Sequence, residues 1–335
     1  MKRRGFKQTL TTALSAFWYR KHPLRWCLYP FALIYMAVIA ARRTYLQMFC
    51  QQPVDVPLIV VGNLTLGGVG KTPLVIALVE YFTAKGLRVG VVTRGYGSTL
   101  QQFPHTVSQE DSASLVGDEA LLIAKKTQAV VVIAPRRMQA VRHLRQHYCS
   151  DIIISDDGLQ HYAMGRAIEV AVIDGVRGLG NGLCLPAGPL REKASRLNQV
   201  DFIVVNTGVW PGAYKMQLIP QQQIVSLTQG CTVLAHDLPM PVAAVAGIGH
   251  PERFFNTLTA LQLVYAAYEF PDHHRFSPDD FKLPESSILM TEKDAVKCQS
   301  FATDKMYVLS VKAQLEADFW LALMSHPQLK RLNLT

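Results

Sequence analysis

The chain has 335 residues, of which 49% are hydrophobic and 18% are charged, and its formal net charge is +9 at neutral pH. This length can bury two hydrophobic cores, so two domains are expected. The six cysteines are spread along the chain and form no C-x-x-C pair, which argues against a disulfide framework or a zinc site and for reduced thiols in the cytosol. The basic excess suits an acidic partner, whether nucleic acid, an anionic membrane surface or a phosphorylated substrate.

Residues 1–50 form a basic and hydrophobic N-terminal segment. Residues 1–25 carry seven lysines and arginines and no acid, with apolar residues interleaved at roughly helical spacing. The uncharged run 26–41 is interrupted by Pro30 and is shorter than the roughly 20 residues that span a bilayer. It fits a short or tilted anchor, an interfacial helix on anionic lipid, or a buried helix of the globular part. We favour membrane contact, with the remainder of the chain on the cytosolic side.

Residues 56–82 read VPLIVVGNLTLGGVGKTPLVIALVEYF, which is a strand-like apolar run, a glycine-rich turn and a segment with helical periodicity. This order is typical of the phosphate-binding loop of nucleotide hydrolases and kinases. Lys71 is expected to reach the β- and γ-phosphates, and the Thr72 hydroxyl to bind Mg²⁺. Thr65 stands where the usual motif has its first glycine. The predicted nucleotide-binding residues are Gly67, Gly68, Val69, Gly70, Lys71 and Thr72.

Strand-like runs alternate with helical segments beyond this loop. They are expected at 88–93, 129–134, 151–155, 169–173 and 201–205. Such alternation predicts an α/β fold with a doubly wound parallel sheet. Functional residues of these sheets lie just past the carboxyl ends of the strands. In this chain those positions include the glycine loop, Arg94, Arg136, Asp156 and Asp157.

Several charged and polar residues near these strand ends are candidates for a site. The pair Asp156-Asp157 after DIIIS is typical of carboxylates that hold Mg²⁺ directly or through water, although turn aspartates are common after strands. Three arginines could bind a substrate phosphate bidentately or be surface charges. They are Arg94, Arg136 and Arg137. Arg191 and Glu192 in PAGPLRE are candidates for the same site, and Asn63 is a further substrate candidate.

The predicted organisation has four parts. They are the N-terminal segment 1–50, a P-loop domain 51–213, a polar linker 214–230 that could hold two extra strands, and a smaller α/β domain 231–335. The smaller domain is expected to contain strands at 242–246, 263–268, 287–290 and 306–310.

Two further places could carry chemistry or simply serve the structure. Asp118 and Glu119 follow a glycine at a predicted helix start, where capping is one role and catalysis the other. His273 and His274 lie in the turn-like PDHHRF stretch, with an acid before them and an arginine after. No third ligand lies at a useful spacing, which argues against a metal site at these histidines.

The motifs GNLTLGGVGKTP, RGYG, GDEA, SDDGLQH, PAGPLRE, PDHHRF and TEKDAVK occur in this order behind the basic N-terminus. Each motif alone is weak, but the ordered set resembles the tetraacyldisaccharide 4'-kinases, the lipid A 4'-kinases of Gram-negative bacteria. The resemblance is firm from Gly62 to Lys297. Thr65 is no departure, because this family carries a non-standard phosphate-binding loop.

The resemblance implies ATP- and Mg²⁺-dependent transfer of the γ-phosphoryl group to the 4'-hydroxyl of a tetraacylated glucosamine disaccharide 1-phosphate. It implies a second, smaller Rossmann-like domain and docking on the cytoplasmic face of the inner membrane, with this glycolipid and the membrane surface as partners. Asp118 would form a base dyad with His273, with His274 as the alternative. Thr72, Asp156, Asp157 and Glu192 would lie near the metal or nucleotide. The TEKD motif receives no role.

A competing interpretation is a membrane-associated ATPase switch of the ParA/MinD kind. That class has a signature lysine directly before the two glycines, and this chain has Leu66 there. A nucleic-acid partner is not expected, because no binding motif supports one and the basic residues concentrate in the hydrophobic N-terminal segment.

Overall fold

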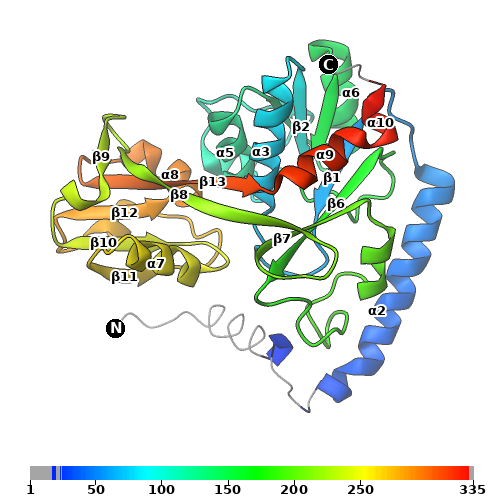
Figure 1. Ribbon diagram of the computed structural model, residues 1–335, viewed down its shortest axis with the longest axis horizontal. Coiled ribbons are helices and arrows are strands. Elements are labelled where there is room, and N and C mark those ends of the chain that lie inside the picture. The colour runs from blue at the N-terminus through cyan, green and yellow to red at the C-terminus, as the bar shows by residue number, and fades with distance from the viewer. Residues whose placement is uncertain (1–16, 20–22, 24, 332–335) are drawn as a thin grey trace. The chain divides into compact units, whose positions relative to one another are not determined.

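The computed structural model describes residues 17–19, 23 and 25–331 (Figure 1). Much of the predicted basic segment 1–25 therefore lies outside the described residues. Contacts divide the chain into two compact units. The first comprises the described residues up to Lys71, then Cys149–Gln217 and the chain from Leu315 on, and the second comprises Thr72–Tyr148 and Leu218–Gln314. Each unit thus combines stretches of both predicted domains, so its bounds differ from those read along the sequence.

Parallel strands form the centre of the first unit, in the order β5-β1-β6-β7. Their bounds are β1 Leu58–Gly62, β5 Ile152–Ser155, β6 Ile168–Gly175 and β7 Phe202–Gly208. Every residue of β1 and β5 is buried, as expected for β-branched strands covered on both faces. The short helices η2 (Ala194–Gln199), α9 (Ala317–Ser325) and α10 (Pro327–Lys330) complete the unit. Phe319 of α9 packs edge-on against Phe202 and Tyr214.

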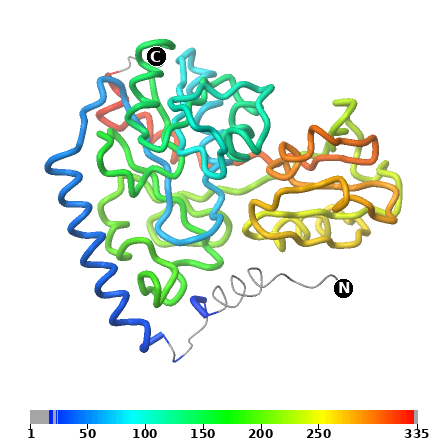
Figure 2. The backbone as a smooth tube through the Cα atoms, turned by 180° about the vertical axis from the view of Figure 1, so that it is seen from behind, coloured from blue at the N-terminus to red at the C-terminus, as the bar shows by residue number. Residues whose placement is uncertain are grey.

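The long helix α2, Arg25–Tyr45, continues into a π-helical turn, η1, at Leu46–Cys50. Pro30 lies inside α2, and Figure 2 traces the helix as one continuous element, so this proline does not interrupt it as the sequence indicated. The side chain of Tyr35 donates a hydrogen bond to the Arg191 carbonyl at 3.0 Å. Among the described helices, none combines the length and the apolar character needed to cross a membrane.

The second unit begins at Thr72, the second residue of α3 (Lys71–Ala84). It continues with a group of strands around β4. The strands are β2 Val89–Thr93, β3 His105–Thr106 and β4 Val130–Ile133, and the helices are α4 Ala113–Val116, α5 Asp118–Lys126 and α6 Arg137–Tyr148. β2 pairs with β4 in parallel, whereas β3 pairs with it antiparallel. The apolar positions of α3, such as Leu74, Leu78 and Phe82, are fully buried, as its helical periodicity predicted.

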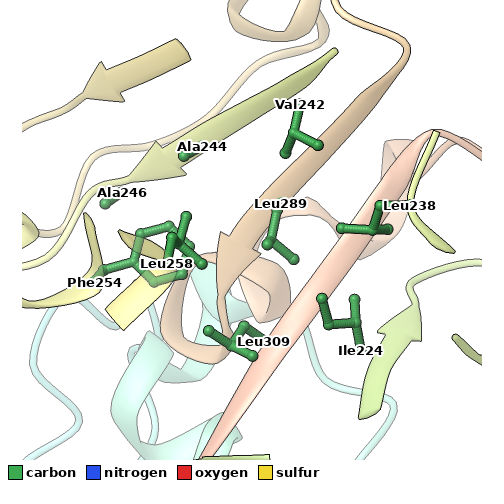
Figure 3. Packing of buried hydrophobic residues seen from close by; sticks show 9 residues of the cluster. All are labelled: Ile224, Leu238, Val242, Ala244, Ala246, Phe254, Leu258, Leu289 and Leu309. Atoms are coloured by element: carbon green, nitrogen blue, oxygen red, sulfur yellow. The ribbon is translucent and has the colours of Figure 1, made fainter. Parts of the chain in front are cut away.

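The other part of the second unit is a parallel sheet in the order β11-β10-β12-β13. Its elements are β10 Val242–Ala246, α7 Pro251–Ala260, β11 Tyr265–Glu269, η4 Pro278–Phe281, β12 Ser287–Thr291, α8 Glu292–Cys298, η5 Gln299–Phe301 and β13 Met306–Leu315. Figure 3 shows its buried core, in which Phe254 and Leu258 of α7 lie beside the strands with Leu289 and Leu309. Helices α5 and α8 also pack against each other. The predicted smaller α/β arrangement is therefore present.

The predicted polar linker 214–230 is instead mostly a long strand. β8 runs from Tyr214 to Ser226, and β9 (Thr232–Leu234) pairs with it antiparallel, followed by η3 at Ala235–Asp237. Over most of β8, exposed residues alternate with buried or partly buried ones, so the polar residues mark one face of a strand and not a loop.

Candidate active site

The glycine-rich loop follows β1 and leads into α3. Gly67 and Gly70 have φ angles of 99° and 92°, a region that non-glycine residues rarely adopt. A Cβ atom at Gly70 would lie 2.3 Å from Asn206 Nδ2, and that nitrogen donates to the Val69 carbonyl at 2.9 Å. Asn206, at the end of β7, therefore holds the loop at a place where only glycine fits.

Lys71 lies at the start of α3, with its ammonium group between polar side chains that follow β1 and β5. Its Nζ is 3.0 Å from Asn63 Oδ1 and 3.3 Å from Asp157 Oδ1. Asn63 is fully buried and also donates to the Thr65 carbonyl at 2.7 Å. The lysine is thus held directly after the loop, and the side-chain amide of Asn63 positions both the lysine and the loop.

The predicted acids of this region lie in a connected set of hydrogen bonds. Arg191 Nη1 is 3.1 Å from both carboxylate oxygens of Asp157. Glu192 accepts hydrogen bonds from Gln160 Nε2 at 3.0 Å and from the Tyr162 hydroxyl. Burial and the neighbouring Glu192 raise the pKa of Tyr162 to about 12, so the phenol remains a donor at neutral pH. Asp156, which directly follows β5, is also buried.

Asp118 and His273 come together although 155 residues separate them. His273 Nδ1 lies 2.9 Å from Asp118 Oδ2 and 3.2 Å from Oδ1. Because a carboxylate only accepts, Nδ1 carries a proton and the neutral ring keeps Nε2 as its basic nitrogen. The ring also packs on Tyr96, with centroids 4.9 Å apart. A carboxylate-oriented histidine of this kind is suited to general-base chemistry.

Opposing effects set the charges of this pair. Burial raises the pKa of Asp118, but the hydrogen bond from His273 and the charge of Lys293 outweigh burial, so the pKa lies below its ordinary value. Burial lowers the pKa of His273, while the hydrogen bond to Asp118 raises it, and the net direction is upward. The carboxylate is therefore ionised at neutral pH and favours a proton on the imidazole.

Local backbone geometry explains how both residues are presented. Gly117, the N-cap of α5, has a φ angle of 93°, and a Cβ atom there would lie 2.5 Å from the Tyr96 carbonyl oxygen. Asp118 therefore enters the helix directly after a position that requires glycine. His273 itself has a φ angle of 58°, a left-handed conformation that is uncommon outside glycine.

His274 points to a different set of residues. Its Nε2 lies 3.3 Å from Asp280 Oδ2, and its ring packs against Phe270 and Phe276. The geometry thus distinguishes the two adjacent histidines, since His273 and not His274 contacts Asp118.

The remaining candidates are more dispersed. Arg94 and Arg136 are exposed, whereas Arg137 is buried in α6. The sequence alone assigns no role to Asn206, Gln160, Tyr162 or Lys293, although Gln160 and Lys293 lie in the SDDGLQH and TEKDAVK motifs. Within the described residues, no group of three or more His, Cys, Asp or Glu side chains is arranged to hold a metal ion.

Comparisons with known proteins agree on one family. Residues 24–328 match the family model described as Tetraacyldisaccharide-1-P 4'-kinase. The chain is 55% identical over 313 residues to the tetraacyldisaccharide 4'-kinase of Legionella pneumophila (strain Lens), across 93% of this chain and 97% of that protein. It is 46% identical over 318 residues to the enzyme of the same name from Shewanella sp. (strain MR-4), across 93% and 94%.

A solved structure gives the same answer at the level of the fold. The crystal structure of LpxK from Aquifex aeolicus in complex with ATP matches with a TM-score of 0.75 and 25% identity, covering 91% of this chain and 99% of that chain. The family model and the relatives span nearly all of the sequence, and the chain therefore belongs to the tetraacyldisaccharide 4'-kinase family.

Proposed function

We propose that this protein is an ATP-dependent kinase that phosphorylates the 4'-hydroxyl of a tetraacylated glucosamine disaccharide 1-phosphate, a step of lipid A biosynthesis. The observation that carries the proposal is the 2.9 Å contact between His273 Nδ1 and Asp118 in a chain of this family. An alcohol acceptor needs a base, whereas a ParA/MinD-like ATPase switch has no acceptor alcohol to deprotonate. The dyad and the family match together disfavour the switch.

The nucleotide is proposed to bind along the glycine-rich loop. Backbone N–H groups of residues 67–70 and the N-terminus of α3 would face its phosphates. Lys71, already held by Asn63 and Asp157, would add its charge to the β- and γ-phosphates. Phosphoryl transfer depends mainly on such positioning and charge stabilisation.

The dyad is proposed to activate the acceptor. His273 Nε2 takes the proton from the sugar hydroxyl while the hydroxyl oxygen forms a bond to the γ-phosphorus. The bond from that phosphorus to the bridging oxygen breaks, and ADP leaves with the electron pair. Asp118 keeps the ring in the required tautomer and stabilises the imidazolium that forms.

Mg²⁺ is proposed to bind beside the loop, because the residues present are oxygen donors of the kind this ion prefers. Thr72 and Asp156 are the proposed ligands, because Mg²⁺ in phosphate-binding loops is held by the hydroxyl after the lysine and by a carboxylate that follows a strand. Asp157 is paired with Lys71 and Arg191, and Glu192 accepts from Gln160 and Tyr162. When bound, the ion would neutralise phosphate charge. Asp157 is then better assigned to holding the two cations than to holding metal.

The glycolipid substrate and an anionic membrane surface are the proposed partners. Helix α2 and the following turn expose large apolar side chains, which monomeric soluble proteins rarely group together. They are Trp26, Phe31, Leu33, Ile34, Val38, Tyr45, Met48 and Phe49. We propose that this face lies in the headgroup region of the cytoplasmic leaflet of the inner membrane. Arg94 and Arg136, both exposed, remain candidates for the substrate phosphate.

The direct test is to incubate the purified full chain with ATP labelled in the γ-phosphate and the tetraacylated disaccharide 1-phosphate. Label is expected in a bis-phosphorylated lipid, and an acceptor that lacks the 4'-hydroxyl should stay unlabelled. Lys71→Ala should lose the transfer, since it removes the charge aimed at the phosphates. An unlabelled lipid from folded wild-type protein would refute the proposed function.

A further inference from the structure

The TEKD motif forms the junction between β12 and α8, and most of its side chains fix that junction in place. Thr291 caps α8 by accepting from the Asp294 N–H at 3.2 Å. Asp294 accepts from the Gly247 N–H at 2.9 Å. Glu292 forms an ion pair with Lys126 of α5. The start of α8 is thereby tied to both β10 and α5.

Lys293, the remaining residue of the motif, reaches the catalytic dyad. Its Nζ lies 3.0 Å from Glu119 Oε1, 3.4 Å from Asp272 Oδ1 and 4.0 Å from Asp118 Oδ2. The lysine side chain is 18% exposed and that of Asp118 is 7% exposed. One largely buried ammonium group thus lies among three carboxylates from two separate segments of the chain.

One of these carboxylates controls the backbone at His273. Asp272 Oδ1 accepts both from Lys293 Nζ and, at 3.1 Å, from the His273 backbone N–H. That hydrogen bond is made where His273 has its left-handed φ angle of 58°, a conformation that needs support from its surroundings. Lys293 therefore braces the loop that aims His273 Nδ1 at Asp118.

The charge of Lys293 acts on both members of the dyad. Burial lowers the pKa of Lys293, but its three acidic neighbours outweigh burial, and the net pKa lies above the ordinary value. The amine is therefore protonated at neutral pH. This positive charge lowers the pKa of Asp118, as Lys297 does more weakly. It also lowers the pKa of His273, against the raising effects of Asp118 and Asp272. The charged groups around the imidazole thus have opposite effects on its pKa. Asp118 and Asp272 favour the protonated ring, and Lys293 favours the neutral ring.

We infer that Lys293 is a positioning residue of the phosphoryl-transfer reaction. Its ammonium group joins α8 to the start of α5 and to the His273 loop, and it thereby holds His273 in line with Asp118. The inference rests on the proposed kinase function. It also gives a role to a motif that the sequence left without one.

The test is the pH dependence of kcat/KM for the glycolipid acceptor in Lys293→Gln, which keeps hydrogen-bonding capacity but removes the charge. The matched control is Lys126→Gln, which breaks the other ion pair between α5 and α8 and leaves the dyad untouched. Lys293→Arg is the conservative variant. Thermal unfolding and ATP binding are measured for each protein.

In Lys293→Gln the acidic limb of the profile is expected to move to higher pH, because His273 holds its proton more tightly. We expect kcat to fall about 10- to 100-fold, part of the roughly 10²–10⁴-fold that a positioned base contributes. The KM for ATP should stay near the wild-type value. The acidic limb of the Lys293→Arg profile should lie at the same pH as that of wild type. The pH profile of Lys126→Gln should coincide with that of wild type.

A folded Lys293→Gln enzyme whose profile coincides with wild type would overturn the inference. Should that variant not fold, Glu119→Gln serves instead, because it leaves the ammonium charge less compensated and should move the limb to lower pH. An unmoved limb in Glu119→Gln then counts equally against the inference. Wild-type protein without acceptor-dependent transfer would refute the kinase function itself, so the two failures are distinguishable.

Discussion

Substitutions at Asp118 and His273 can separate the contribution of the dyad to turnover from that of neighbouring residues. Asp118→Asn and His273→Gln should each slow turnover by about 10²–10⁴-fold, because a positioned base is lost. ATP affinity should be unchanged, since neither residue belongs to the glycine-rich loop. His274→Gln is the matched control, because that ring contacts Asp280 and not Asp118. Steady-state rates that are equal in the His273 and His274 variants would contradict the assignment.

The protonation of His273 gives the wild-type rate a predictable pH dependence. A base must be neutral before it accepts a proton, and the pKa of His273 lies above its ordinary 6.5. The rate should therefore rise with pH through a midpoint above 6.5 and be lost below it. In Asp118→Asn the carboxylate that raises this pKa is gone, so the limb of the residual activity should move to lower pH. A limb at or below 6.5 in wild type would contradict this account.

The site residues differ in how far the sequence revealed them. The nucleotide loop was predictable because its glycines, Lys71 and Thr72 form a contiguous pattern with a physical reason for each position. Asp118 and His273 were paired only through the family resemblance, since no spacing rule connects residues 155 positions apart. Asn206 and Lys293 were missed because their roles exist only through contacts with distant segments.

At the scale of elements, the start of α5 depends on Gly117. Gly117→Ala should lower the free energy of unfolding by about 1–3 kcal/mol, the range for a strained backbone position, because the new Cβ atom would meet the Tyr96 carbonyl oxygen at 2.5 Å. Turnover should fall as well, since Asp118 is displaced. Thermal melts and initial rates measure the two effects.

Gly97→Ala is the control for this substitution. Gly97 also has a positive φ angle, 79°, but an added Cβ atom would meet nothing within 4 Å. It should cost stability through backbone strain alone and leave turnover close to wild type. If both alanine variants lost activity equally, close approach at Gly117 would not be the cause.

Strands were predicted best where burial is complete. β1 and β5 are short, fully buried strands in which most residues are β-branched, so composition alone indicates them. The polar composition of 214–230 indicates a linker, yet β8 forms there because neighbouring segments bury every few of its residues. Pro30 predicts an interruption of the apolar run, yet α2 continues through it, so this proline near the helix start does not mark a boundary.

At the scale of the whole molecule, the exposed face of α2 should govern membrane binding. Replacing Trp26, Phe31 and Ile34 by serine should reduce partitioning onto phosphatidylglycerol vesicles by at least about 1,000-fold, given roughly 1.5–3 kcal/mol for each large apolar side chain that is fully buried. The control replaces Val264 and Leu321, which are exposed outside α2, and should sediment with vesicles as wild type does. Equal sedimentation of both variants would contradict the docking proposal.

The division into two units was the least predictable feature of the chain. Composition shifts along a sequence indicate contiguous domains, but each unit here combines segments from both predicted parts. The residues after Leu315 belong to the first unit although they follow directly on the smaller α/β sheet. Which segments join a unit depends on long-range packing, and no local pattern records it.

The central claim is that ATP is consumed in order to phosphorylate one alcohol of a glycolipid. The most direct measurement follows ADP release and phosphorylated lipid in the same reaction, with and without the 4'-hydroxyl on the acceptor. The account predicts one phosphorylated lipid for each ADP with the intact acceptor, and only background ADP when that hydroxyl is absent. ADP release that is unaffected by the acceptor would contradict the account and favour an ATPase switch.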